Sequence, residues 1–420
     1  MKSIRYLYRI GNGPSSSHTI GPSRISKYAV KNFPNADHFD VTLFGSFALT
    51  GRGHMTDKAI VSSCAPIQTN IYFDFKTKTE HPNTVKFDVY NKDGSHEVLW
   101  ATSPGGGSIR INGEKSAPEP EIYKEKNFAD IRKVCEKNNW TLVDYVVNRE
   151  GEEIFDYLGE VYDAMMESID RGLKATGELP GKLHVHRRAK DFLKSLYEDE
   201  SEVGNSFRMM YAYAFAVSEE NASGGIVVTA PTCGSCGVLP AVMKYYGEKY
   251  KKPRQTILEA LAVAGIIGNV IKYNASLAGA EAGCQAEIGS ACSMAAAAYA
   301  YLKKEDIDGI ECAAEVAMEH SLGLTCDPVG GYVIIPCIER NAIAAIRAVA
   351  AGRLAEYAHA SNAVSFDTVV ETMYKTGKDL NKRYRETAKG GLAESFMKAM
   401  KKAPKKPVRP KHKKRIIDAK

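Results

Sequence analysis

Three of the nine cysteines stand in Gly-rich loops, where their thiols could do chemistry. Cys284 lies in AEAGCQAEIGSACSM, and Cys326 and Cys337 bracket DPVGGYVIIP. Three thiolates from separate loops suit an iron–sulfur cluster in which one iron keeps an open position and acts as a Lewis acid. The spacings match no compact ferredoxin pattern, however. From spacing alone, free thiols buried in an Ala-rich core are the better interpretation.

Cys233 and Cys236 form the one CxxC pair of the sequence. This spacing is typical of zinc and redox sites. A zinc ribbon needs a second CxxC, and a thioredoxin-like site needs a βαβ context. Because both are missing from the pattern, the pair remains a weak candidate. We interpret the remaining thiols as packing residues: Cys64, Cys135, Cys292 and Cys312.

Two histidines lie in loops rich in glycine and hydroxyl groups. His18 belongs to GPSSSHTIGP, which can be a helix N-cap or a nest of hydroxyl and N–H groups around a carboxylate. The motif lacks the Gly-Lys-Ser/Thr ending of a P-loop. His54 belongs to TGRGHMTDKA, and a histidine framed by glycine on a loop is a candidate general base.

The chain changes its hydrophobic period near residue 126, which predicts two structural units. HFDVTLFGSFAL, NIYFDF and TVKFDVYN alternate with period two, as strands do. Later segments such as TILEALAVAGIIGNVIKYNA have helical spacing and faces of small residues, which let helices approach closely. We predict an α+β protein: a β-rich α/β sandwich domain over residues 1–125, an all-α catalytic domain over 126–397 and a basic disordered tail over 398–420.

The net charge of +6 is concentrated at the C-terminal end. Residues 398–420 hold eleven Lys and Arg residues against the single acid Asp418, so the rest of the chain is mildly acidic. A tail of this kind is typical of a solvated end, and we expect no specific nucleic-acid site. The N-terminal segment is too polar for a secretory signal, and no uncharged apolar run reaches 18 residues. We therefore expect no membrane span and a reducing, cytoplasmic location.

Six stretches resemble, in the same order, the iron–sulfur-dependent L-serine dehydratases (L-serine ammonia-lyases) of bacteria in their single-chain form. The resemblance runs from about residue 4 to residue 393. The stretches are GPSSSHTIGP, TGRGHMTDKA, LPGKLHVHRRA, VVTAPTCGSCGVLPAV, YNASLAGAEAGCQAEIGSACSMAAAA and CDPVGGYVIIPCIERNA. The resemblance implies a β-type domain followed by an all-α catalytic domain, and a [4Fe–4S] cluster bound by Cys284, Cys326 and Cys337.

The same resemblance implies roles for the hydroxyl and histidine motifs. His54 would be the base, with His18 beside it. The substrate L-serine would be contacted by Ser15, Ser16, Ser17, Thr19 and Asn274. The implied reaction dehydrates and then deaminates L-serine, and gives pyruvate and ammonia, with the cluster as Lewis acid. This chain departs from the family at the cysteines of PTCGSCG and in having no cysteine after Cys337, so no cysteine from the tail would reach the open iron.

Two other functions stay open from the sequence. One is a related β-eliminating lyase that acts on cysteine or threonine. The other is a non-enzymatic zinc or redox protein centred on Cys233 and Cys236. A homodimer is the default expectation for the oligomeric state, because C2 dimers are the commonest soluble oligomers.

Overall fold

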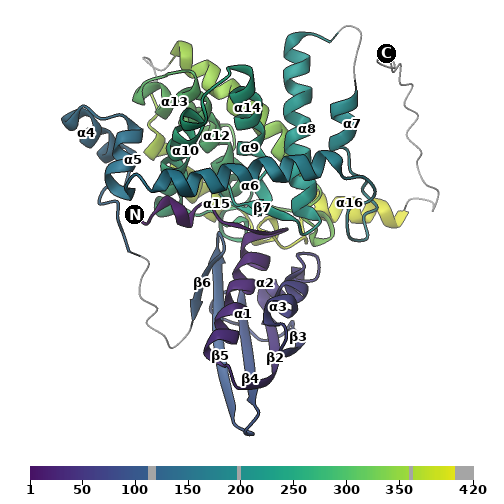
Figure 1. Ribbon diagram of the computed structural model, residues 1–420. Helices are drawn as coiled ribbons and strands as arrows, with labels where there is room; N and C mark the ends of the chain where they lie inside the picture. Colours follow the sequence, from purple (N-terminus) through teal and green to yellow (C-terminus); the bar gives the residue numbers. More distant parts are fainter. Residues whose placement is uncertain (112–119, 196–199, 359–362, 403–420) are drawn as a thin grey trace.

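The computed structural model describes residues 1–111, 120–195, 200–358 and 363–402. A small unit of strands and helices projects from a larger helical unit (Figure 1). The predicted α+β class is therefore confirmed.

The small unit is built on a five-stranded mixed sheet with the order β3-β2-β4-β5-β6. Its strands are β2 (Ala36–Phe44), β3 (Gln68–Asp74), β4 (Thr84–Asn91), β5 (His96–Gly105) and β6 (Ser108–Ile111). β2 pairs in parallel with β3, and the other pairs are antiparallel, with Val41 opposite Phe87. The three runs predicted as strands from period-two alternation contain β2, β3 and β4. The second half of HFDVTLFGSFAL is not a strand, because Gly45–Thr50 forms a helix.

Helices cover one face of this sheet: α1 (Gly21–Asn32), α2 (Gly45–Thr50) and α3 (Thr56–Cys64). The alternate residues Phe39, Val41 and Phe87 are fully buried beneath them. Val98 and Trp100 of β5 point to the other face and are exposed. This one-sided burial is why the strands read as alternating apolar and polar residues.

The large unit is a bundle around α12 (Ser290–Leu302), which packs against α9, α10, α13 and α14. Its helices are α4 (Phe128–Asn138), α5 (Leu142–Glu150), α6 (Ile154–Lys174), α7 (Ala189–Lys194), α8 (Glu202–Ala222), α9 (Val238–Lys249), α10 (Arg254–Asn274), α11 (Gly279–Ala282), α12, α13 (Ile307–Glu319), α14 (Cys337–Ala358), α15 (Phe366–Asp379) and α16 (Gly391–Lys402).

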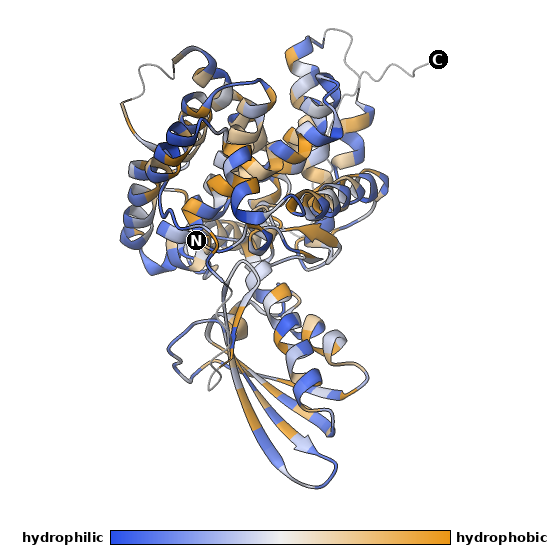
Figure 2. Cartoon of the chain, turned by 60° about the vertical axis from the view of Figure 1, so that its left-hand side comes forward, coloured by the Kyte–Doolittle hydropathy of each residue, from blue (hydrophilic) through white to orange (hydrophobic). Residues whose placement is uncertain are grey.

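Small residues set the spacing of this bundle. The alanines of α12 from Ala295 to Ala298 are fully buried. A Cβ placed on Gly352 of α14 would lie 2.4 Å from the ring of Tyr299, so a larger residue there would push the two helices apart. Apolar residues gather on the inner faces of the helices (Figure 2). α10 is long and apolar enough to cross a membrane, but 78% of its apolar window is buried in the bundle, as in a core helix.

The first residues of the chain pack with the helical unit and not with the sheet. Ile4, Leu7 and Tyr8 belong to the core of the bundle, and the Tyr8 hydroxyl donates to the carbonyl of Leu261 at 2.8 Å. β1 (Ile10–Asn12) pairs antiparallel with β7 (Ile226–Val228). The GPSSSHTIGP motif is consequently held at the junction of the two units.

The predicted basic tail begins inside α16, which continues to Lys402. Residues 403–420 lie outside the described part of the chain.

Candidate active site

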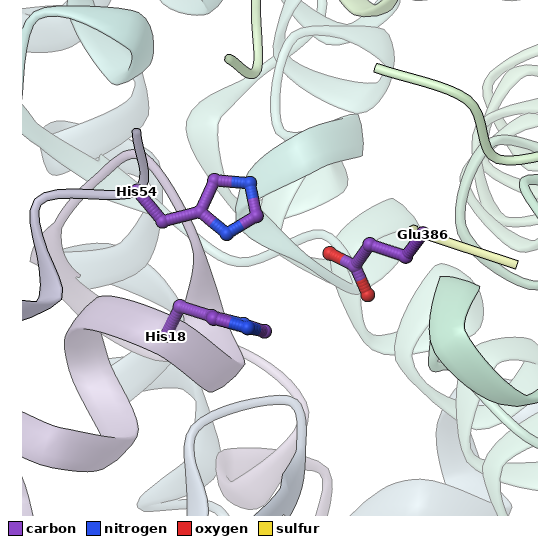
Figure 3. A group of neighbouring side chains, drawn as sticks. All are labelled: His18, His54 and Glu386. Atoms are coloured by element: carbon purple, nitrogen blue, oxygen red, sulfur yellow. The ribbon is translucent and has the colours of Figure 1, made fainter. Parts of the chain in front are cut away.

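Three titratable side chains meet at the junction of the two units. The ring nitrogens of His18 and His54 and the carboxylate of Glu386 offer ligand atoms within 4.8 Å of one another. The two imidazole rings make an edge contact with centroids 4.6 Å apart. Figure 3 shows the carboxylate of Glu386 pointing toward the space between the two rings. Sequence reasoning placed the two histidines in one site, and the structure brings them together.

His18 is held by hydroxyl groups of its own motif and of α2. It lies in a π-helical turn, Ser16–Ile20, which leads directly into α1; such turns are frequent at functional sites. Ser15 caps this turn by accepting from the N–H of His18 at 3.2 Å. Ser17 Oγ lies 2.9 Å from Nδ1 of His18, and Ser46 Oγ lies 3.0 Å from Nε2. Both ring nitrogens therefore have protein partners, which fix the ring in place.

His54 differs from His18 because its ring is left available. It lies in the turn between α2 and α3, and its carbonyl accepts from Thr19 Oγ1 at 2.9 Å. Neither ring nitrogen has a hydrogen-bond partner among the described residues, although both are buried. Burial lowers the pKa of His54 from 6.5 to about 4. The imidazole is thus neutral near pH 7 and able to accept a proton from a substrate.

Glu386 is carried by a segment that runs beside Cys326. The N–H of Glu386 donates to the carbonyl of Cys326 at 2.8 Å, and the N–H of Cys326 donates to the carbonyl of Tyr384 at 2.8 Å. Burial, with a further contribution from Cys284, raises the pKa of Glu386 to about 7. This carboxyl group can therefore hold a proton near neutral pH.

The three cysteines of the Gly-rich loops converge next to Glu386. Cys284 and Cys326 are buried, and Cys337 is partly buried. A hydrogen bond between Cys284 and Cys326, together with the charge of Arg340, lowers the pKa of Cys284 to about 6. Burial, with a further contribution from the charge of Cys284, raises the pKa of Cys337, so that thiol lies in the same electrostatic environment.

Helix ends position two of these thiols. Cys284 directly precedes a second π-helical turn, Gln285–Gly289, which continues into α12. Cys337 is the first residue of α14. The N-terminus of a helix stabilises a nearby negative charge. At Cys337 this acts against burial, which raises the pKa of the thiol well above its usual value.

Small residues and one partly buried acid line the space around the thiols. A Cβ on Gly279 would lie 2.9 Å from Cys326 Sγ and 3.0 Å from Glu287 Oε2. A Cβ on Gly234 would lie 3.3 Å from Glu287 Oε1. Burial raises the pKa of Glu287 well above its usual value. Glycine is therefore needed here so that the backbone can approach the sulfur and carboxyl groups closely.

Other predicted site residues have different surroundings. The hydroxyl groups of Ser15, Ser17 and Thr19 make hydrogen bonds within the protein. Their partners are groups of the π-turn and of the two histidines. Ser16 is buried in the same turn. Asn274 is exposed, and its amide donates to the carbonyls of Lys126 at 2.6 Å and Val270 at 3.0 Å. The side chain of Asn274 therefore bonds to backbone groups at the end of α10 and beside it, and not to the histidines.

The CxxC pair and Cys292 lie in the apolar core. Cys233, Cys236 and Cys292 are fully buried, and burial raises the pKa of each thiol. Within the described residues, neither member of the pair belongs to a compact group of three metal-ligating side chains. This environment favours neutral, inert thiols.

Sequence reasoning missed Glu386, Glu287 and Arg340. Arg340 and Glu287 each stand three residues after a proposed thiol ligand, in CIER and CQAE, so helical spacing could have indicated that they share its neighbourhood. Glu386 stands in RYRETAKGG, where only the glycine pair signals a loop. Its place in the site depends on the pairing with Cys326, which has no signature in the sequence.

Comparison with known proteins identifies the class of enzymes to which the chain belongs. The model of the serine dehydratase beta chain matches residues 3–66, and that of the serine dehydratase alpha chain matches residues 76–393. The chain belongs to the serine dehydratase family.

Curated relatives match over nearly their whole length. The chain is 39% identical to an L-serine dehydratase of Haemophilus influenzae, 38% identical to L-serine dehydratase 1 of Escherichia coli and 36% identical to an L-serine dehydratase of Streptomyces coelicolor. Each match covers 94% of this chain and 99% of the relative.

Proposed function

We propose that the protein is an L-serine ammonia-lyase that converts L-serine to pyruvate and ammonia. The observation that carries this proposal is the buried, unpartnered and neutral imidazole of His54, which faces Glu386 and lies next to the three-cysteine group. Elimination from serine needs a base at Cα and assistance to the hydroxyl that leaves Cβ. Both kinds of group lie at one junction.

The three thiols fit a [4Fe–4S] cluster better than a single metal ion. Among the described residues, Cys284, Cys326 and Cys337 do not form one group compact enough for a single ion. The irons of a cubane cluster are separate, so their thiolates are spread further apart. The lowered pKa of Cys284, the adjacent Arg340 and the two helix N-termini favour negative charge at Cys284. The hydrogen bond with Cys284 raises the pKa of Cys326, and burial raises that of Cys337, so these two thiols would lose their protons on binding the cluster. When bound, such a cluster supplies a Lewis-acidic iron for the leaving hydroxyl.

The protein's own residues account for the proton transfers. His54, neutral at pH 7, accepts the Cα proton of serine. Glu386, close to both His54 and Cys284, is placed to hand a proton to the departing hydroxyl. His18 is fixed by Ser17 and Ser46, and its ring packs against the ring of His54. This contact limits the orientations of the His54 ring.

The products follow from loss of water. The Cα–H and Cβ–O bonds break, and aminoacrylate and water leave. Aminoacrylate takes up a proton at Cβ to become an imine, which water hydrolyses to pyruvate and ammonia. One water molecule is lost in the elimination and one is consumed in the hydrolysis. The net reaction therefore divides serine into pyruvate and ammonia.

The reaction is tested with anaerobically purified protein by measuring pyruvate from L-serine, 2-oxobutyrate from L-threonine, and sulfide from L-cysteine. We expect the highest kcat/KM with L-serine. Faster release of 2-oxobutyrate or sulfide would assign the site to the related β-eliminating lyases.

A reducing compartment suits the free thiols, and we propose the cytoplasm as the location of the protein.

The base is tested by His54→Gln, which keeps a polar side chain of similar size but removes the basic nitrogen. We expect at least a 100-fold loss of kcat with an unchanged cluster spectrum. Normal turnover by this variant would place the base elsewhere.

A further inference from the structure

A second cavity opens on the other wall of the loops that hold the histidines. It has a volume of about 940 Å³ and is bounded by the N-terminal segment, α1, the start of α3 and Tyr157 of α6. Thr19 and Met55 belong to its lining, whereas His18, His54 and Glu386 do not. The cavity therefore adjoins the candidate active site without being part of it.

The lining is strongly cationic. It contains five basic side chains and, among the described residues, no acidic one: Arg5, Arg9, Arg24, Lys27 and Lys58. The nearest carboxylate in the sequence, Asp57, accepts from the backbone N–H of Lys58 at 2.9 Å and is outside the lining. The like charges of Arg5, Arg24, Lys27 and Lys58 around one hollow repel each other, and a bound anion would relieve that repulsion.

Two arginines are held in position and have no ion-pair partner in the described part of the chain. Arg24 Nη1 donates to the carbonyl of Gly107 at 2.6 Å, and Arg5 Nη2 donates to the carbonyl of Glu153 at 3.1 Å. Arg5 also lies over the ring of Tyr157, with its Cζ 5.4 Å from the centroid. Bonds to carbonyl groups and ring contacts order the guanidinium groups but leave their charge for a ligand.

Hydroxyl groups complete the lining, with Ser23, Ser62 and Ser63 near the lysines. Guanidinium groups, ammonium groups and serine hydroxyls together are the usual donors for phosphate and carboxylate oxygens. L-Serine itself is a zwitterion without net charge at pH 7. The cavity matches a ligand with several negative charges and not the substrate.

We propose that this cavity is a regulatory site for a small, multiply charged anion, an organic phosphate or a polycarboxylate, and that its occupancy is transmitted to His54. Two contacts provide the connection. Thr19, in the cavity wall, donates its hydroxyl to the carbonyl of His54 at 2.9 Å. Met55, also in the wall, has a left-handed backbone with φ 55°, which ties the His54 turn to the start of α3.

The direction of the effect follows from the elements that carry the charges. Lys27 lies on α1, which follows the His18 turn, and Lys58 lies on α3, which follows the His54 turn. An anion shared by both lysines would hold these two helices together and so fix the histidines, which precede the helices in the chain, relative to each other. We therefore expect the anion to lower the KM for L-serine.

Binding is tested first by calorimetry on the anaerobically purified full chain, with pyrophosphate, inorganic phosphate and citrate at constant ionic strength. We expect a Kd below about 1 mM for pyrophosphate or for citrate, and about tenfold weaker binding in Lys27→Ala/Lys58→Ala. The matched control is Lys31→Ala/Lys76→Ala, which removes two exposed lysines outside the cavity. Preference for pyrophosphate would identify an organic phosphate, and preference for citrate a polycarboxylate.

Coupling is tested by serine kinetics with and without the anion that binds best. We expect the KM to fall about fivefold in the unmodified protein and in the control, and to stay constant in Lys27→Ala/Lys58→Ala. Absence of binding by all three anions, or equal loss in the control variant, would overturn the site. Binding without any change in KM would overturn the link to His54. Because calorimetry needs no turnover, a failure of the proposed serine reaction would be recognised separately.

Discussion

The environment of His54 makes a quantitative prediction about the pH dependence of catalysis. The ring is buried and has no hydrogen-bond partner among the described residues, and burial lowers its pKa from 6.5 to about 4. At pH 5.5 a histidine of ordinary pKa would be only about 9% neutral, whereas one with a pKa of 4 would be about 97% neutral. If His54 is the base, protonation of this residue should cost almost none of the rate at pH 5.5.

The assay is kcat/KM for L-serine, measured under anaerobic conditions between pH 5 and pH 8 at constant ionic strength. From pH 7.5 to pH 5.5 we expect protonation of His54 to lower kcat/KM by less than about twofold, against about tenfold for an ordinary imidazole. Over the same interval Glu386, whose pKa is about 7, takes up its proton and should raise kcat/KM. Cluster content measured at each pH separates loss of metal from protonation of the base. An acid limb centred at pH 6.5 with full cluster content would refute the account of His54.

Three further perturbations test other parts of the account. Glu386→Gln should lower kcat by at least about 100-fold while the cluster spectrum is retained, and a normal kcat would remove Glu386 from the proton transfers. Folding lowers the pKa of His54, so the native protein binds fewer protons than the unfolded chain between pH 4 and pH 6.5. The free energy of unfolding should therefore fall by about 3 kcal/mol as the pH drops through that interval. In denaturant titrations of the metal-free protein, the free energy of unfolding of the His54→Gln variant should fall by less. Gly172→Ala should cost at least about 1–3 kcal/mol of stability, because its Cβ would lie 2.2 Å from the carbonyl oxygen of Ala216, whereas Gly159→Ala on the same helix, with its nearest neighbour at 3.5 Å, should be neutral or slightly stabilising; equal midpoints for the two variants would contradict this packing.

The sequence predicted the two kinds of structural unit because their hydrophobic periods differ. The buried positions Phe39, Val41 and Phe87 alternate with polar residues, which indicates a half-covered sheet. Faces of alanine and glycine likewise indicated a closely packed bundle around α12. These are local signals, and the structure confirms the α+β class that they predict.

The placement of the N-terminal segment could not be predicted in this way. Pairing of β1 with β7 joins residues more than two hundred positions apart, and nothing in IGN or IVV specifies the partner. The same limit explains why Glu386 was missed. Its approach to the histidines depends on backbone hydrogen bonds to Cys326, which any residue type could form.

The candidate site was predicted in part. The resemblance singled out His18, His54 and the three cysteines, and the structure brings both groups to one junction. The structure also shows contacts that the sequence motifs did not predict. The hydroxyls of Ser17 and Thr19 contact the histidines, and a contact of these hydroxyls with the substrate remains a prediction.

The central claim is that Cys284, Cys326 and Cys337 hold an iron–sulfur cluster next to His54. The most direct test is iron, sulfide and zinc analysis of anaerobically purified protein and of the Cys284→Ala, Cys326→Ala and Cys337→Ala variants. Cys292→Ala is the control, because that thiol is buried in the core apart from the site. We predict about four iron and four sulfide atoms per chain in the unmodified protein and in Cys292→Ala, and loss of both with loss of activity in each of the other three. About one zinc per chain, or full iron and activity in Cys326→Ala, would contradict the account.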